Sequence, residues 1–326
     1  MRPFAYAHVN DAAEAVKAGG TFLAGGTTLL DLMKLDVMRP ERVVDINDLS
    51  REFSAIAYGP QGLRLGALAH MAEAARHPDV VREFPVIAQS LSLAASGQLR
   101  NMATLGGNVL QRTRCTYFRD TSWSRCNKRD PGSGCAALEG VNRKHAVLGT
   151  SPNCIATYAG DFAQSLIALD AAVELAGPSG ARRMAFADLH VAPGDDPSVE
   201  TVLRPGELIT GFIVPALPFA RRSLYLKIRD RQSYEFALAS AAVALDLDGG
   251  TVRQARIALG GVATKPWRAR EAEAALRGKA LDESSARAAA EAAFAGAVTH
   301  GGNDYKPELG KRTLVCALLQ AKALEV

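Results

Sequence analysis

The chain has 326 residues, 48% of them hydrophobic and 22% charged, with a net charge of only +4. This length allows two or three domains with a substantial core, and the balanced charge argues against nucleic acid as a partner. No apolar run approaches the roughly 18 residues of a membrane span, and the N-terminus MRPFAYAHVN lacks the apolar segment of a signal peptide. We therefore expect no membrane span and a cytoplasmic location, with export of the folded chain beside a signal-bearing partner as the alternative.

The first 55 residues predict a compact alternating unit. Asn10 is expected to cap a short helix over 11–18, and TFLAG at 21–25 reads as a buried strand. GGTTLLDLMKL then opens an amphipathic helix, and VVDI at 43–46 is a second strand. A strand, a glycine-rich turn and a helix in this order direct backbone N–H groups toward an anion.

The middle of the chain predicts a mixture of helices and strands. The expected elements are a hairpin over 55–67, helices over 70–77 and 79–95, a turn TLGGN at 104–108, a helix running into a strand over 161–177, and strands over 182–190 and 207–215. Three alternating strands are expected next, over 223–231, 239–250 and 251–262, followed by Ala-rich helices from residue 266.

Four of the five cysteines fall between residues 115 and 154, in the spacing C-x10-C-x8-C-x18-C. The surrounding stretch is rich in Gly, Pro, Asn, Ser, Arg and Lys, so it cannot order itself by burying apolar area. A metal or iron–sulfur site is favoured, while disulfides and unrelated free thiols stay open. The basic residues of the stretch face an acidic partner or offset the charge of a thiolate site. Cys316 stands alone and is expected to be an inert core thiol.

Two short loops, 24–28 and 104–108, offer glycine N–H groups and hydroxyls without bulky side chains. Neither fits the Walker loop or the Rossmann fingerprint, which makes an ATPase or a Rossmann dehydrogenase unlikely on sequence grounds. Two such cradles suit a diphosphate with a long ligand on each side. The alternative is that both are plain turns.

LAGGTTLLDLM together with ATLGGN, KIRDRQSYEFALASAAVAL and ALGGVATKPWRAREAEAALRG resembles the FAD subunit of the molybdenum hydroxylases. This family includes xanthine dehydrogenase, carbon monoxide dehydrogenase and aldehyde oxidoreductases. The resemblance covers nearly the whole chain and implies an α+β fold. It implies a vanillyl-alcohol-oxidase-like (PCMH-type) FAD-binding domain over 1–218, with subdomains 1–55 and 56–218. A C-terminal CO-dehydrogenase-flavoprotein-like domain over 219–326 would hold a three-stranded antiparallel sheet and helices.

Most flavin subunits of the family pass directly from GGN into an S-P-x-x-D segment. Here the cysteine-rich stretch, about 112–155, stands between GGN and SPNCIATYAGD. This resembles the subgroup with an extra 4Fe-4S cluster, as in periplasmic aldehyde oxidoreductase. The resemblance implies a 4Fe-4S cluster, with zinc as the alternative metal. Its four cysteine ligands would be Cys115, Cys126, Cys135 and Cys154.

The family's FAD contacts, carried over by position, fall on fourteen residues of this chain. The pyrophosphate loop and second loop correspond to Leu23, Ala24, Gly25, Gly26, Thr27, Thr28, Leu29, Leu30, Thr104, Gly107 and Asn108. Asp161 matches a residue that binds ribitol or ribose hydroxyls, Ile209 an apolar contact, and Lys227 a basic residue near the cofactor. For Asp161 and Lys227 a solvated or helix-capping charge is the alternative. Tyr234 either covers a ring face or is a packed aromatic.

The histidines show no pattern of a metal triad or general base, and we interpret them as surface or supporting groups. No catalytic side chain is expected in this chain, because flavin chemistry belongs to the cofactor. The resemblance implies an electron-transfer subunit whose partners are a large molybdenum-cofactor subunit, a small 2Fe-2S subunit and an external electron acceptor. A stand-alone oxidase of the vanillyl-alcohol type and a zinc-stapled scaffold without flavin are the alternatives.

Overall fold

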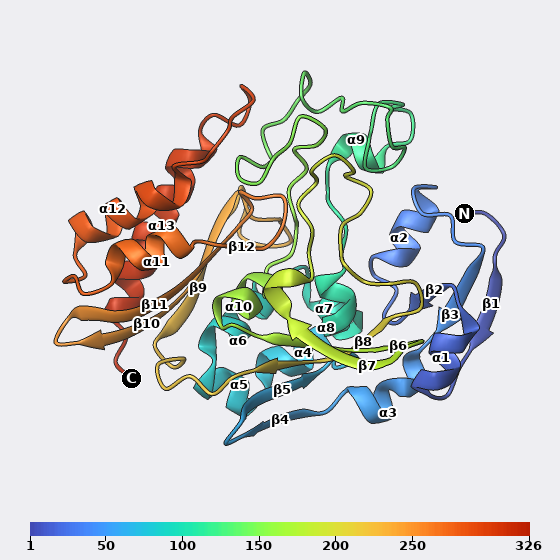
Figure 1. Ribbon diagram of the computed structural model, residues 1–326, viewed down its shortest axis with the longest axis horizontal. Coiled ribbons are helices and arrows are strands. Elements are labelled where there is room, and N and C mark those ends of the chain that lie inside the picture. The colour runs from blue at the N-terminus through green and yellow to red at the C-terminus, as the bar shows by residue number, and fades with distance from the viewer.

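The computed structural model describes all 326 residues. The N-terminal unit is a three-stranded parallel sheet in the order β1-β3-β2, flanked by short helices (Figure 1). Its elements are β1 (Ala5–His8), α1 (Ala12–Ala18), β2 (Thr21–Leu23), α2 (Leu29–Lys34), β3 (Arg42–Asp45), η1 (Asn47–Leu49) and α3 (Ser50–Phe53).

Two details of this unit differ from the predictions. The cap of α1 is Asp11, whose side chain accepts from the Glu14 N–H at 2.8 Å, and not Asn10. Asn10 instead donates its backbone N–H to the Glu14 carboxylate. The strand β2 is only half-buried, because it lies at the edge of the sheet beside β3 alone.

The second unit is built on a five-stranded antiparallel sheet in the order β4-β5-β8-β6-β7. Its strands are β4 (Ile56–Gly59), β5 (Gly62–Gly66), β6 (Ala172–Gly177), β7 (Gly180–Ala185) and β8 (Leu208–Val214), with η2 (Phe186–Asp188) after β7. Its helices are α4 (Met71–Arg76), α5 (Pro78–Glu83), α6 (Pro85–Ser92), α7 (Gly97–Met102), α8 (Leu105–Val109) and α10 (Phe162–Ala168). A core of 37 buried residues packs the helices against the sheet.

The strand expected over 182–190 ends at Ala185, where η2 begins, and two other predictions in this unit are wrong. The single helix expected over 79–95 is two helices, because Phe84 leaves the helical conformation before Pro85, which begins α6. The segment expected as a turn at 104–108 is the short helix α8, capped by the Thr104 hydroxyl, which accepts from the Gly107 N–H at 3.3 Å.

The C-terminal unit holds an antiparallel sheet in the order β12-β11-β10-β9, with three helices packed on it (Figure 1). Its elements are β9 (Ser223–Ile228), β10 (Ala239–Asp248), β11 (Thr251–Gly260), β12 (Trp267–Arg268), α11 (Arg270–Leu276), α12 (Glu283–Phe294) and α13 (Lys306–Lys322). The expected three strands are present, and the two-residue β12 adds a fourth. Cys316 lies exposed on α13, so its prediction as a core thiol is wrong.

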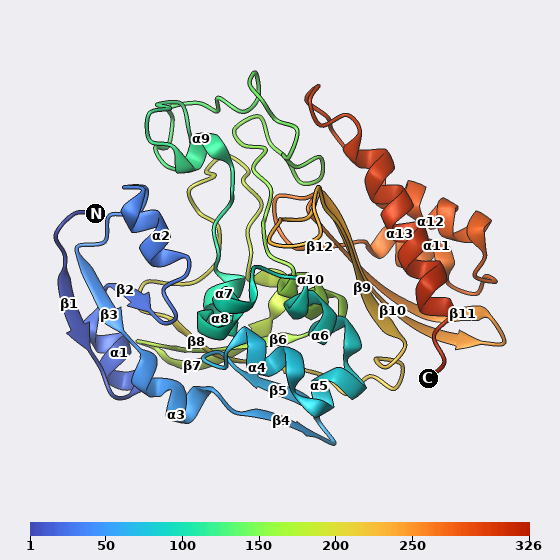
Figure 2. The ribbon, with the colours of Figure 1, turned by 180° about the vertical axis from the view of Figure 1, so that it is seen from behind.

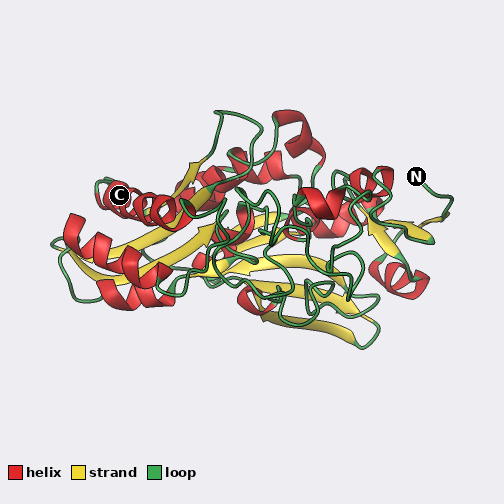
Figure 3. Ribbon diagram, turned by 90° about the horizontal axis from the view of Figure 1, so that it is seen from above, coloured by secondary structure: helices red, strands yellow, loops and turns green.

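The segment 112–155 forms a lobe made almost entirely of loops, which rises from the end of α8 and contains only α9 (Thr116–Arg119) (Figure 2). Figure 3, viewed from above, shows how little regular structure covers the middle of the molecule. We call the segment 112–155 the cysteine lobe. None of the helices combines the length and the apolar character needed to cross a lipid bilayer.

Candidate functional site

A cleft lies where the N-terminal unit meets the second unit, with about 1280 Å³ of empty space including its mouth. Nine of the predicted cofactor residues contribute to its walls: Ala24, Gly25, Gly26, Thr27, Thr28, Leu29, Thr104, Gly107 and Ile209. The fold therefore brings the two glycine loops, about 80 residues apart in sequence, to one cavity. A cleft of this size accommodates a long ligand lying across both loops.

The first loop lies against the end of α7, just before the second loop, and glycine permits this close approach. A Cβ on Gly25 would lie 1.8 Å from the carbonyl oxygen of Met102, at the end of α7. Gly26 adopts φ +70°, a conformation that favours glycine. Thr28 precedes α2 without using its hydroxyl as a cap, so that hydroxyl is free to donate to a ligand.

Asn108 supplies a second sign that a polar ligand belongs beside α8. Its Oδ1 is buried without a hydrogen-bond partner, while its Nδ2 contacts the Met71 sulfur at 3.3 Å. An unpaired buried amide oxygen costs about 1–3 kcal/mol unless a donor reaches it. A ligand hydroxyl would remove that cost, so the residues present fit the hydroxyl-rich chain of FAD.

The other five predicted residues do not line the cleft: Leu23, Leu30, Asn108, Asp161 and Lys227. Leu23 and Leu30 pack against a small apolar cluster with Leu29 and Met33 and support the loop from behind. Three charged residues line the cleft in addition to the predicted set: Arg112, Arg204 and Glu207. Only Arg112 carried a sequence signal, as the first residue of the basic stretch.

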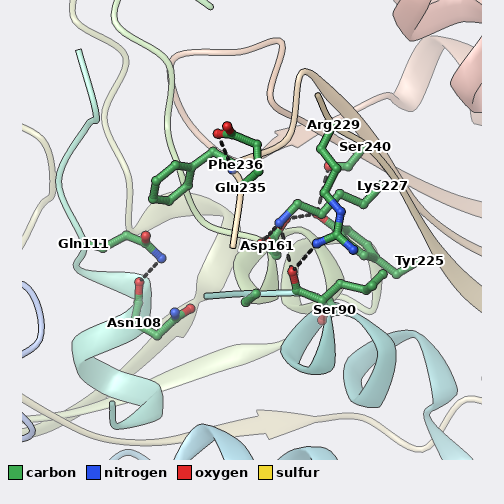
Figure 4. A network of polar contacts seen from close by, with 12 residues as sticks. Ser90, Asn108, Gln111, Asp161, Tyr225, Lys227, Arg229, Glu235, Phe236 and Ser240 are labelled. Atoms are coloured by element: carbon green, nitrogen blue, oxygen red, sulfur yellow. Dashed lines mark hydrogen bonds and ion pairs between the residues drawn. The ribbon is translucent and has the colours of Figure 1, made fainter. Parts of the chain in front are cut away.

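Asp161 and Lys227 form a buried ion pair, shown in Figure 4. Lys227 Nζ lies 2.7 Å from Asp161 Oδ2 and also donates to the Leu93 carbonyl at 3.1 Å. The Tyr225 hydroxyl donates to Asp161 Oδ1 at 2.7 Å and lies 2.8 Å from the Ser240 hydroxyl. Both charged side chains are at most 4% exposed, and Asp161 makes no capping bond to α10. The alternative of a solvated or capping charge is therefore wrong.

The electrostatics of this pair follow from its burial. Burial raises the pKa of Asp161, and Lys227 and Tyr225 oppose that rise through charge and hydrogen bonding.

In Figure 4 Asn108 and the Asp161–Lys227 pair lie on opposite sides of the view, with Phe236 above them. Tyr234, two residues earlier, is 56% exposed with φ +52°, so it is not a packed core aromatic.

A second, smaller cavity lies inside the cysteine lobe, and all four clustered cysteines line it. Every cysteine of the chain is a free thiol in the structure. Burial raises the pKa of Cys115 to about 12 and that of Cys154 to about 11, so thiolates there need a nearby cation. No three His, Cys, Asp or Glu side chains converge closely enough to hold a single metal ion.

His145 is a residue of this region that the sequence did not single out. Its Nε2 lies 3.1 Å from Cys115 Sγ, and its Nδ1 is buried without a partner. Burial lowers the pKa of His145 and of His190 to about 4. Both rings are buried, so of the two roles expected for the histidines these two are supporting groups and not surface groups.

Comparison with known proteins agrees with this geometry. The family described as "FAD binding domain in molybdopterin dehydrogenase" matches residues 2–217, and "CO dehydrogenase flavoprotein C-terminal domain" matches residues 224–321. The aldehyde oxidoreductase FAD-binding subunit PaoB of Escherichia coli is 46% identical, with 99% of each chain aligned. The carbon monoxide dehydrogenase medium chain of Afipia carboxidovorans is 28% identical over 93% of this chain and 87% of its own.

A solved structure gives the same result for the fold. Carbon monoxide dehydrogenase from Hydrogenophaga pseudoflava superposes with a TM-score of 0.76 at 28% identity, covering 99% of each chain. The fold and the cleft thus define a flavin-binding oxidoreductase subunit. The chain belongs to the FAD-binding subunits of the molybdenum hydroxylase family, as the sequence resemblance indicated. The alternative of a stand-alone oxidase of the vanillyl-alcohol type is not supported.

Proposed function

We propose that this chain is the flavin subunit of an aldehyde-oxidising molybdenum enzyme, in which it passes electrons from the 2Fe-2S clusters of a small subunit to an external acceptor. The identity of 46% with an aldehyde oxidoreductase subunit, over 99% of both chains, supports the aldehyde as substrate class. The designations "FAD-binding subunit" and "medium chain" of the relatives support a large molybdenum-cofactor partner and a small iron–sulfur partner.

The observation that carries the flavin assignment is that two glycine loops, distant in sequence, line one cleft. Gly25, Gly26, Thr27 and Thr28 would bind the pyrophosphate through N–H and hydroxyl groups, with Thr104 and Gly107 facing them across the cleft. Bound FAD would supply a carrier that holds one or two electrons, whereas each 2Fe-2S cluster moves one.

The remaining predicted residues have supporting parts in this proposal. Asn108 would accept a hydrogen bond from a cofactor hydroxyl through its unpaired Oδ1. Ile209 provides an apolar wall of the cleft. Asp161 and Lys227 form an ion pair that joins the start of α10 to β9. Their role toward FAD is to orient the adjoining wall and to provide charge near the ring.

For the cysteine lobe we propose a 4Fe-4S cluster held by Cys115, Cys126, Cys135 and Cys154. In a tetrahedral zinc site with Zn–S bonds of about 2.3 Å, the sulfurs lie about 3.8 Å apart. No three such ligands converge on one point, yet all four cysteines surround one cavity. A cubane spreads its ligands, one for each iron, over a larger volume. This arrangement favours the cluster over a single zinc ion.

Purification without oxygen of the chain with its co-eluting partners tests both cofactors. We expect one FAD per chain released without proteolysis, and about four iron and four sulfide ions per lobe. Repeating the iron and sulfide assay on the isolated chain distinguishes iron in the lobe from iron in the 2Fe-2S clusters of a partner. Stoichiometric zinc with no iron would overturn the cluster, and absence of flavin would overturn the cleft assignment.

The relay is tested by reduction kinetics. The isolated chain should not be reduced by an aldehyde, because it has no molybdenum site. Its flavin absorbance should bleach once the molybdenum and 2Fe-2S subunits are added with the aldehyde. Turnover by the isolated chain would overturn the relay.

A further inference from the structure

Two of the four lobe cysteines face each other directly across a pair of antiparallel segments. Cys126 and Cys135 form an isolated antiparallel bridge. The hydrogen bonds lie on either side of the cysteines: Asn127 N–H donates to the opposite segment at 2.7 Å, and Ala136 N–H donates back at 3.0 Å. The cysteines are therefore a non-hydrogen-bonded cross-strand pair, in which the Cα atoms lie about 4.5 Å apart. Disulfides span Cα separations of about 4.4–6.8 Å.

The other two lobe cysteines lack such a partner. The backbone of Cys154 is bridged to Ser151, and the sulfur of Cys115 contacts the ring of His145. Access also differs within the facing pair: Cys135 is partly exposed, whereas Cys126 is buried at 7% exposure. An incoming reagent reaches Cys135 first.

We propose that Cys126 and Cys135 form a specific intrachain disulfide whenever the lobe is free of iron and meets a low-molecular-weight disulfide. This inference rests on the proposed four-cysteine cluster site. The Cys135 thiolate attacks a sulfur of oxidised glutathione and releases one glutathione thiolate. The Cys126 thiolate then attacks the Cys135 sulfur of the mixed disulfide and releases the second. The two cysteine protons pass to the two departing thiolates, so two thiols are oxidised and one glutathione disulfide is reduced.

The disulfide would withhold two of the four ligands from iron. Cluster insertion would then require prior reduction of this bond by a thiol or dithiol. In the loaded lobe the same sulfurs are engaged by iron, so the cluster protects the pair from oxidation. The pair thus separates two stable forms of the lobe, one with iron and one cross-linked.

Peptide mapping reads out this pairing without ambiguity. Cleavage after Lys and Arg places each lobe cysteine on its own peptide, namely residues 115–119, 126–128, 130–143 and 145–182. The full chain would be freed of iron by a chelator under dithiothreitol without oxygen, desalted and treated with oxidised glutathione. After alkylation it would be digested without reductant and analysed by mass spectrometry. Iron-loaded protein, Cys126→Ser and Cys154→Ser would be treated in parallel.

We expect the linked pair of peptides 126–128 and 130–143 at about tenfold the yield of any other cysteine pair. Cys126→Ser should abolish it and Cys154→Ser should retain it. Equal yields of several pairings, or glutathionylation without an intrachain bond, would overturn the inference. Iron and sulfide analysis before chelation tests the cluster separately. Protein that lacks iron as isolated yet forms this disulfide contradicts the cluster and leaves the pairing intact.

Discussion

The FAD cleft and the cysteine lobe are built by opposite means. The cleft is walled by helices and strands anchored in a core of 37 buried residues and another of eight. The lobe has one four-residue helix, and its apolar clusters hold only four and three buried residues, the smaller one shared with Leu32 of α2. Packing therefore fixes the cleft before any cofactor arrives, whereas the lobe has little apolar area to hold its shape.

Polar contacts take the place of a core in the lobe. Glu200, on the loop after β7, lies 2.7 Å from Lys128 and 2.8 Å from Arg112. Arg119 reaches Asp31 of α2 at 2.9 Å. Such partly exposed pairs contribute about 0–1 kcal/mol each, so they position the lobe without making it stable. The difference between the two regions implies that losing the proposed cluster loosens the lobe outside local bridges such as Cys126–Cys135 and spares the cleft.

The largest effect is expected from Cys154→Ser. This change should remove iron and sulfide together, because a buried cysteine ligand is lost. Trypsin should then cut the lobe about tenfold faster, since the stretch is rich in Arg and Lys and loses its constraint. FAD content should remain that of the unmodified protein. Cys316→Ser, on the exposed face of α13, is the matched control and should change none of these quantities.

The proposed difference between a lobe held by its cluster and a cleft held by its core is contradicted if Cys154→Ser leaves the lobe as resistant to trypsin as before. It also fails if FAD is lost in proportion to iron, because the cleft would then depend on the lobe.

The next effect concerns the buried ion pair of Asp161 and Lys227. Lys227→Met leaves the Asp161 carboxylate buried without its cation, which should lower the free energy of unfolding by about 3–5 kcal/mol. Adding Asp161→Asn should recover part of this loss by removing the unpaired charge. Lys34→Met, on the exposed side of α2, is the control and should stay within about 0.5 kcal/mol. Urea unfolding monitors all three variants, and a loss below about 1 kcal/mol for Lys227→Met would contradict a structural role for the pair.

Much of the fold was accessible from the sequence because it depends on local patterns. The hairpin around Gly59 and Gly62, the helix-to-strand passage after Asp161 and the three long C-terminal strands follow from alternation and turn residues. The sequence does not predict the strand β12, because two residues are too few to show an alternation of apolar and polar side chains. The helix α8 was read as a turn because LGGN has low helical propensity, which the Thr104 cap and the packing of Leu105 override.

The site was only partly accessible for a different reason. Glycine loops can be recognised from the sequence, yet the contact of Gly25 with Met102 depends on tertiary packing. The charges of Asp161 and Lys227 are ordinary in sequence and become a buried pair only when the fold brings the start of α10 to β9. His145 had no signal at all, since its closeness to Cys115 arises from the path of the lobe across 30 residues.

A smaller effect is expected from filling the cleft itself. A Cβ on Gly107 would meet only the Thr104 hydroxyl, at 3.1 Å, so Gly107→Val should fold and project its side chain into the space for FAD. Crowding of about 2 kcal/mol would weaken FAD binding about 30-fold, with iron unchanged. Gly97→Val, at the start of α7 with open space around it, is the control. FAD titration measures both, and equal affinities would remove Gly107 from the cofactor site.

The smallest effect tests the junction of the two regions, where the His190 ring lies 2.9 Å from the carbonyl of Val109, the last residue of α8. Burial holds the pKa of His190 near 4, below its ordinary value of 6.5. As pH falls from 6.5 toward 4, the unfolded chain takes up a proton at this residue and the folded chain does not. Stability is therefore lost in that window, by up to about 1.4 kcal/mol per pH unit for this group.

His190→Gln keeps a donor for Val109 and removes the titration, so its unfolding free energy should fall less steeply with acid. His145, whose pKa is also about 4, gives a similar slope in both proteins and cancels from the comparison. Urea unfolding at several pH values between 7 and 5 measures the two slopes, and identical slopes would show that His190 is not buried in its neutral form.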